Sequence, residues 1–140
     1  MYFRGVLILC CLFLQFCSHN KIALSLCSID YFTRANPEGF IEQMEQPIVV
    51  RNVRGKITNT IDGWPKDLPI LFELRGIEMG AKTIQVYADA EGNFEMPRIP
   101  KGHYCFKATV DGWRSVMGII KVDKRADPKK MIHIVMLIGV

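Results

Sequence analysis

The chain has 140 residues, 49% of them hydrophobic and 23% charged, with a formal net charge of +4. This length suits one small domain and leaves no room for a second once an N-terminal leader is set apart. The Lys and Arg residues are scattered and form no run interleaved with aromatic residues, so the composition does not favour a nucleic-acid-binding protein.

The N-terminus has the features of an export signal. Arg4 gives a positive start, and the apolar stretch over 6–16 is long enough for a signal peptide but short for a membrane span. We therefore predict that residues 1–25 are a signal peptide or an uncleaved N-terminal anchor. The protein is then extracytoplasmic, either periplasmic or secreted. It would meet a membrane only through this N-terminus, uncleaved or lipidated at Cys17 or Cys27.

Two cysteines lie beyond the predicted leader, Cys27 and Cys105. In an oxidising compartment they allow one disulfide. The alternative is that Cys27 is removed or free and that Cys105 is an inert small hydrophobic residue. Because the chain has no CxxC pair and only three histidines, we expect no structural metal and no cofactor.

A spacer is predicted over residues 26–47. The turn residues at 36–40 and the acidic stretch that follows do not show the periodicity of a strand or a long helix. The segment either sets the domain off from the leader or covers one face of a sheet with its aromatic residues, Tyr31, Phe32 and Phe40.

The remaining residues, 48–140, are predicted to form strands. Turn residues separate seven runs rich in β-formers, and no convincing amphipathic helix is present. The runs are 48–58, 68–75, 82–88, 93–97, 103–111, 115–122 and 130–137. This pattern favours an all-β domain, a seven-stranded antiparallel Greek-key β-sandwich. In the fifth run, Phe106 and its alternate neighbours are expected to face the core, and Cys105 the other side.

The same region resembles the carboxypeptidase regulatory-like domain, a transthyretin-like β-sandwich. Turns and strands carry the resemblance by their order and spacing. The residues concerned are Val53-Arg54-Gly55-Lys56-Ile57, Leu68 to Leu74, Asp89 with Glu91-Gly92-Asn93-Phe94, Ile99-Pro100-Lys101-Gly102-His103-Tyr104 and Gly112-Trp113. The resemblance implies a non-catalytic module and fixes no ligand.

The function expected from the sequence is binding or structural support in the cell envelope, with an envelope protein or a surface glycan as partner. The expected contact surfaces are the loops around Trp64 and residues 76–80, or an open sheet edge. The alternative is a small transthyretin-like hydrolase or small-ligand carrier. The hydroxyisourate hydrolases of that fold end in Tyr-Arg-Gly-Ser, whereas this chain ends in Leu-Ile-Gly-Val. His103 and His133 form no recognisable catalytic set with neighbouring residues, so no enzyme is expected.

Two tryptophans and one acidic turn are candidate ligand-binding features. Trp64 and Trp113 each follow Asp-Gly, and each either closes an end of the core or forms a platform for a sugar or an apolar peptide. Trp113 is the better core residue and Trp64 the better candidate for exposure. The turn at 89–93 offers oxygen ligands for calcium, but it lacks a closing carboxylate, which favours a plain hairpin turn.

Overall fold

The computed structural model describes residues 27–33, 41–60 and 68–138. Within these ranges the chain forms one short 3-10 helix and nine strands. They are η1 (Ile29–Tyr31), β1 (Ile41–Gln43), β2 (Ile48–Val50), β3 (Arg54–Asn59), β4 (Leu71–Gly76), β5 (Thr83–Tyr87), β6 (Asn93–Glu95), β7 (Gly102–Thr109), β8 (Ser115–Val122) and β9 (Ile132–Met136). The predicted leader and Trp64 lie outside the described residues.

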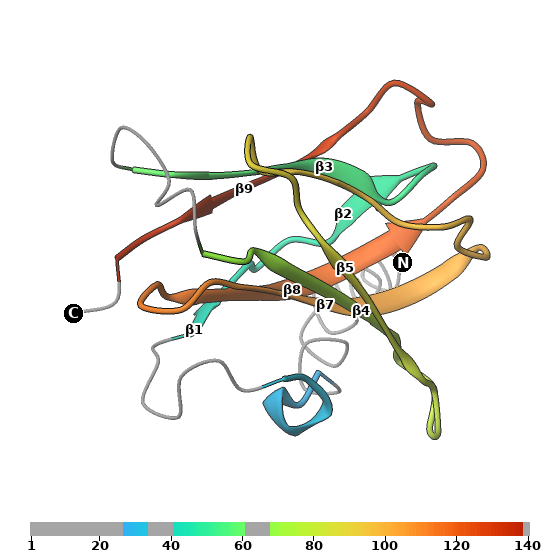
Figure 1. The fold of residues 1–140 in the computed structure, drawn as a ribbon. Helices are drawn as coiled ribbons and strands as arrows, with labels where there is room; N and C mark the ends of the chain where they lie inside the picture. Colours follow the sequence, from blue (N-terminus) through green and yellow to red (C-terminus); the bar gives the residue numbers. More distant parts are fainter. Residues whose placement is uncertain (1–26, 34–40, 61–67, 139–140) are drawn as a thin grey trace, which may run out of the picture.

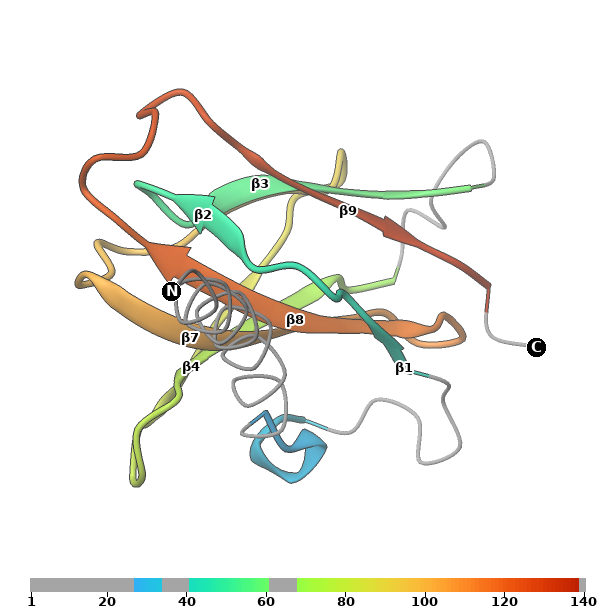
Figure 2. The same ribbon diagram turned by 180° about the vertical axis from the view of Figure 1, so that it is seen from behind.

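The strands form two sheets that face each other (Figure 1, Figure 2). The larger sheet has the order β1-β8-β7-β4-β5, and β2 also pairs with β8. The smaller sheet has the order β6-β3-β9. The architecture of the described residues is therefore all-β and sandwich-like, and none of their helices is long and apolar enough to cross a membrane.

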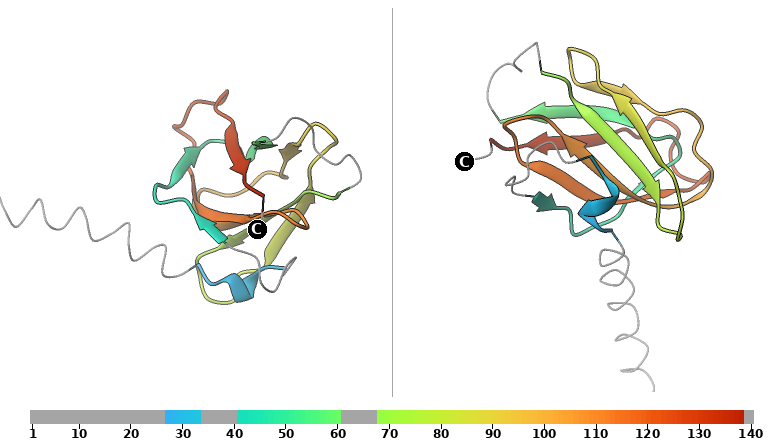
Figure 3. Two further views of the ribbon diagram at one scale, coloured as in Figure 1. Left: turned by 90° about the vertical axis from the view of Figure 1, so that its left-hand side faces the viewer. Right: turned by 60° about the horizontal axis from the view of Figure 1, so that its bottom comes forward.

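One hydrophobic core lies between the sheets. Alternate residues of β4, β7 and β8 meet those of β3, β6 and β9 there. Its centre is a stack of three aromatic rings. The ring centroid of Phe94, in the smaller sheet, lies 4.1 Å from that of Phe72, and the centroid of Phe72 lies 5.6 Å from that of Phe106. Seen end-on in Figure 3, the two sheets form successive layers, and η1 lies beyond the larger one.

The described residues form nine strands, with parallel as well as antiparallel pairs, where seven antiparallel strands were expected. The predicted run 48–58 is two strands, because the chain bends at Arg51–Val53 and crosses from β8 in the larger sheet to β6 and β9 in the smaller one. In addition, β1 and β2 run parallel to β8, and β3 runs parallel to β9. Strand direction depends on which distant segments meet, and local residue patterns do not encode it.

The final run also differs from expectation. The mostly apolar residues from Met131 to Ile138 predict a central strand buried on both faces, but β9 lies at an edge of the smaller sheet and alternates between buried and exposed residues. Its polar His133 and its neighbour Val135 are exposed. Gly55 has no side chain, and this lets β3 lie close to β9. A Cβ at this position would stand 2.1 Å from the carbonyl oxygen of Ile132.

The acidic turn at 89–93 connects the two sheets. It leads from β5 in the larger sheet to β6 in the smaller one, so the expected hairpin between paired strands is wrong. The Asp89 carboxylate accepts hydrogen bonds from the side chain of Asn93, at 3.0 Å, and from the backbone N–H groups of Asn93 and Glu91, at 2.7 and 3.1 Å. These bonds hold the pKa of Asp89 below its ordinary value. Gly92 supplies the positive φ that the turn needs.

Candidate functional site

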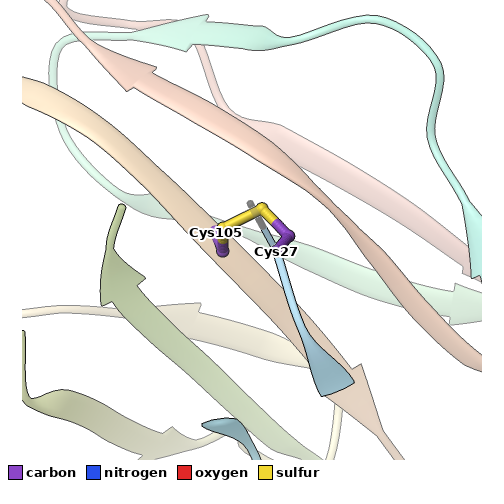
Figure 4. Close-up of a disulfide and its surroundings, with 2 residues drawn as sticks. All are labelled: Cys27 and Cys105. Atoms are coloured by element: carbon purple, nitrogen blue, oxygen red, sulfur yellow. A yellow bond between two sulfur atoms is a disulfide. The ribbon is translucent and has the colours of Figure 1, made fainter. Parts of the chain in front are cut away.

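Residues 27–33, here called the N-terminal segment, pack on the outer face of the larger sheet. A disulfide joins Cys27 to Cys105 of β7, with a Cα–Cα distance of 5.6 Å (Figure 4). Phe32 is buried against Cys105 and Met117. From the sequence, this disulfide was one of two alternatives for the cysteines, and a sheet face covered by Phe32 was one of two alternatives for the spacer. The described parts of the predicted spacer thus pack against the domain: the N-terminal segment covers the sheet, and β1 extends it.

A buried polar cluster fixes the end of the N-terminal segment. The backbone N–H of Thr33 donates to both carboxylate oxygens of Glu73 at 3.1 Å, and Lys107 Nζ donates to the Thr33 carbonyl oxygen at 2.5 Å. Gln85 Nε2 donates to Glu73 Oε1 at 2.8 Å and to Thr33 Oγ1 at 3.0 Å. Glu73 lies between Gln85 and Lys107 in the sheet register, so side chains of three adjacent strands together hold one residue, Thr33.

The disulfide should stabilise the fold, because it closes a long loop with a sequence separation of 78 residues. We expect Cys27→Ser to lower the free energy of unfolding by about 2–4 kcal/mol, measured by urea denaturation. The oxidised wild type should show the same loss after treatment with a thiol reductant, while Cys27→Ser should not respond to the reductant. Equal stability of the oxidised wild type and Cys27→Ser would contradict this role.

Beside the disulfide lies a surface formed by Tyr31, Arg75 and residues 76–80, here called the loop surface. It surrounds a cavity of about 360 Å³ that reaches Cys105. Met79 is fully exposed and Tyr31 is half exposed. The guanidinium carbon of Arg75 lies 4.3 Å from the centroid of the Tyr31 ring. Thr83 Oγ1 donates to the Tyr31 carbonyl oxygen at 3.1 Å. The tyrosine is therefore held in place although its ring faces solvent.

A second cavity, here called the basic cavity, has a volume of about 590 Å³ and lies at the same end of the sandwich. It is formed by the three connections that cross between the sheets there: β2 to β3, β6 to β7 and β8 to β9 (right-hand side of Figure 1). Each connection contributes at least one cationic side chain. The four cations are Arg51, Arg98, Lys101 and Lys124, and Glu95 is the one carboxylate among the described lining residues.

Hydrogen bonds tie these connections to one another and to the strands. The Met96 N–H donates to the Val53 carbonyl oxygen at 2.9 Å, and Arg54 Nη2 donates to the Pro128 carbonyl oxygen at 3.0 Å. Tyr104 donates its hydroxyl to the Pro100 carbonyl oxygen at 2.9 Å. Partial burial and the nearby Glu78 carboxylate raise the pKa of Tyr104, so its hydroxyl stays protonated at neutral pH.

Of the two candidate tryptophans, the structure describes Trp113. Trp113 is 8% exposed and belongs to the main core cluster, which favours the core alternative over a ligand platform. Trp64 lies outside the described residues. His103 is exposed at the start of β7, in the larger sheet, while His133 is exposed on β9 in the smaller one. Sequence reasoning did not identify the basic cavity, because its cations come from separate segments.

Comparison of the sequence with protein-family models and with curated proteins finds no match. Within the described ranges, no group of three or more His, Cys, Asp or Glu residues is placed to hold a metal ion.

Proposed function

We propose that this protein is an exported, non-catalytic β-sandwich module that binds a partner protein of the cell envelope through the loop surface. The observation that carries the proposal is the combination of Tyr31, Arg75 and Met79 around one cavity. Tyr, Arg and Met are enriched at protein interfaces, where they supply large contact areas. The Arg75–Tyr31 contact and the disulfide lower the cost of ordering this surface on binding, because part of it is already fixed.

We further propose that the sandwich is of the carboxypeptidase regulatory-like, transthyretin-like type, with β3 to β9 as its seven Greek-key strands. Two observations support this. These strands divide into a sheet of four and a sheet of three, as in common β-sandwich domains. The residues that carry the resemblance also serve the framework: Gly55 permits close strand approach, Asp89 caps its turn, and Trp113 lies in the core.

Export is supported by the apolar stretch at 6–16 and by the disulfide, because disulfides persist mainly in oxidising compartments. Intact mass and N-terminal sequencing of protein recovered outside the cytoplasm should show a disulfide-bonded chain that retains Cys27. Recovery of the protein only from the cytoplasm, with Cys27 and Cys105 reduced, would contradict export.

The binding function is tested by photo-crosslinking in the cells that produce the protein. A benzoylphenylalanine residue replaces Met79 in one variant and Asp111 in another. Asp111 is also exposed, but it lies in the β7–β8 turn at the opposite end of the sandwich (left-hand side of Figure 1). We expect a discrete crosslinked species for the Met79 variant and none for the Asp111 variant. No crosslinked species at Met79, or equal crosslinking at both positions, would contradict the proposal.

A further inference from the structure

The basic cavity combines an apolar floor with a cationic rim. Three lining residues are almost fully buried, and the few atoms that they expose form the floor of the cavity. They are Val53, Met96 and Val122. The cations Arg51, Arg98, Lys101 and Lys124 are exposed around them. A ligand that fits this cavity must therefore have both an apolar surface and negative charge. Its volume of about 590 Å³ lies within the usual range for small-molecule sites.

The positive charge at this end is not cancelled by nearby carboxylates. Among the described lining residues, four side chains are cationic and one, that of Glu95, is a carboxylate. A further carboxylate, that of Asp123, precedes Lys124 in the chain and accepts a hydrogen bond from the Arg125 N–H at 3.0 Å. This bond and the charges of Lys101, Lys121 and Arg125 hold the pKa of Asp123 below its ordinary value. A net positive field therefore surrounds the cavity.

The walls of the cavity are formed before any ligand binds. The hydrogen bonds of Met96 to Val53 and of Arg54 to Pro128 join all three connections, and the Asp123 N–H donates to the Val50 carbonyl oxygen at 2.9 Å. Pro97 and Pro128 also stiffen two of the connections. A site with fixed walls costs less to order when a ligand arrives.

The lining also distinguishes between classes of anionic ligand. The described lining residues include no aromatic side chain on which a nucleobase or a neutral sugar ring would stack. Guanidinium and ammonium groups instead favour carboxylate, sulfate or phosphate groups, with which they form charge-assisted hydrogen bonds. A sugar ring that carries such groups supplies both the apolar face and the charge.

We propose that the basic cavity binds an acidic saccharide, with the sugar ring on the floor of Val53, Met96 and Val122 and its anionic substituents on the rim cations. This site is separate from the loop surface, although both lie at the same end of the sandwich. The protein would thus contact an acidic glycan and a partner protein side by side.

Isothermal titration calorimetry with defined oligosaccharides tests the proposal. The probes are a heparin-derived hexasaccharide, which is sulfated, an oligogalacturonate, which is carboxylated, and maltohexaose, which is neutral. We expect an acidic probe to bind, maltohexaose not to bind, and the affinity to fall as salt is added. The combined change Arg98→Ala and Lys101→Ala should weaken binding by about tenfold or more, because two charge-assisted contacts are lost.

The matched control is Lys129→Ala with Lys130→Ala. It removes the same charge from exposed residues next to the cavity that do not line it. The control should change affinity by less than about twofold, and thermal unfolding should show that both variants are folded. Equal losses in the two variants would overturn the proposal, since binding would then reflect net charge alone.

Three other results would also overturn it: equal binding of maltohexaose, tighter binding of a single-stranded oligonucleotide or of anionic lipid vesicles, or no binding of either acidic probe at about 1 mM. Crosslinking at Met79 does not depend on any of these results, so the proposed function can stand if this inference fails.

Discussion

Replacement of Phe106 by Ala is expected to lower the free energy of unfolding by about 3–5 kcal/mol. Phe106 is fully buried, and its ring stacks on Phe72, which stacks on Phe94 of the opposite sheet. Truncation would leave a cavity at the point where the two sheets meet. The ring of Phe72 would also lose its stacking contact with Phe106. Urea denaturation of wild type and variant measures the loss.

The matched control is Tyr87→Ala. Tyr87 is an aromatic residue of the same sheet, but its side chain is 66% exposed, so its removal should change stability by less than about 0.5 kcal/mol. A near-neutral effect of Phe106→Ala would mean that β7 presents its other face to the core. A large effect of Tyr87→Ala would mean that the edge strand β5 is covered by a part of the chain or by a second copy.

The strand β7 illustrates how far sequence reasoning reached. Its alternation correctly predicted that Phe106 faces the core. For the opposite face two alternatives were open, partial exposure or a cover formed by the spacer, and Cys105, Lys107 and Thr109 are buried. The N-terminal segment covers Cys105 and Lys107, and its contacts span more than 70 residues of sequence. A period of two therefore shows which residues share a face, but not whether a distant segment covers that face.

Contacts between distant segments also explain why the basic cavity was not predicted from the sequence. Sequence reasoning named the pair Cys27 and Cys105 because few cysteines remained outside the leader. It passed over Arg51, Arg98 and Lys124 because each stands at a separate turn. What brings them together is the sheet topology: three connections cross between the sheets at one end. One local pattern could have indicated the cavity: in each of the three connections a basic residue stands next to a turn residue, Asn, Pro or Asp.

The buried polar cluster leads to the second large expected effect. Lys107 is 1% exposed and Glu73 is 0% exposed, and the two are direct neighbours in the register of β4 and β7. We expect Lys107→Met to lower the free energy of unfolding by about 3–5 kcal/mol. The change removes a buried ammonium group and leaves the buried Glu73 carboxylate without its cationic neighbour. It also leaves the Thr33 carbonyl oxygen without the donor that held it.

A double variant separates the loss of the ammonium group from the cost of the abandoned carboxylate. Glu73→Leu combined with Lys107→Met removes both charges and keeps apolar volume in the same place, so it should be more stable than Lys107→Met alone. Urea denaturation of the wild type and all three variants gives the coupling free energy. If the two single losses simply add in the double variant, Glu73 and Lys107 act independently of each other. Coupling in the expected direction would mean that the larger sheet and the N-terminal segment are joined by one polar unit, in addition to the disulfide at Cys105.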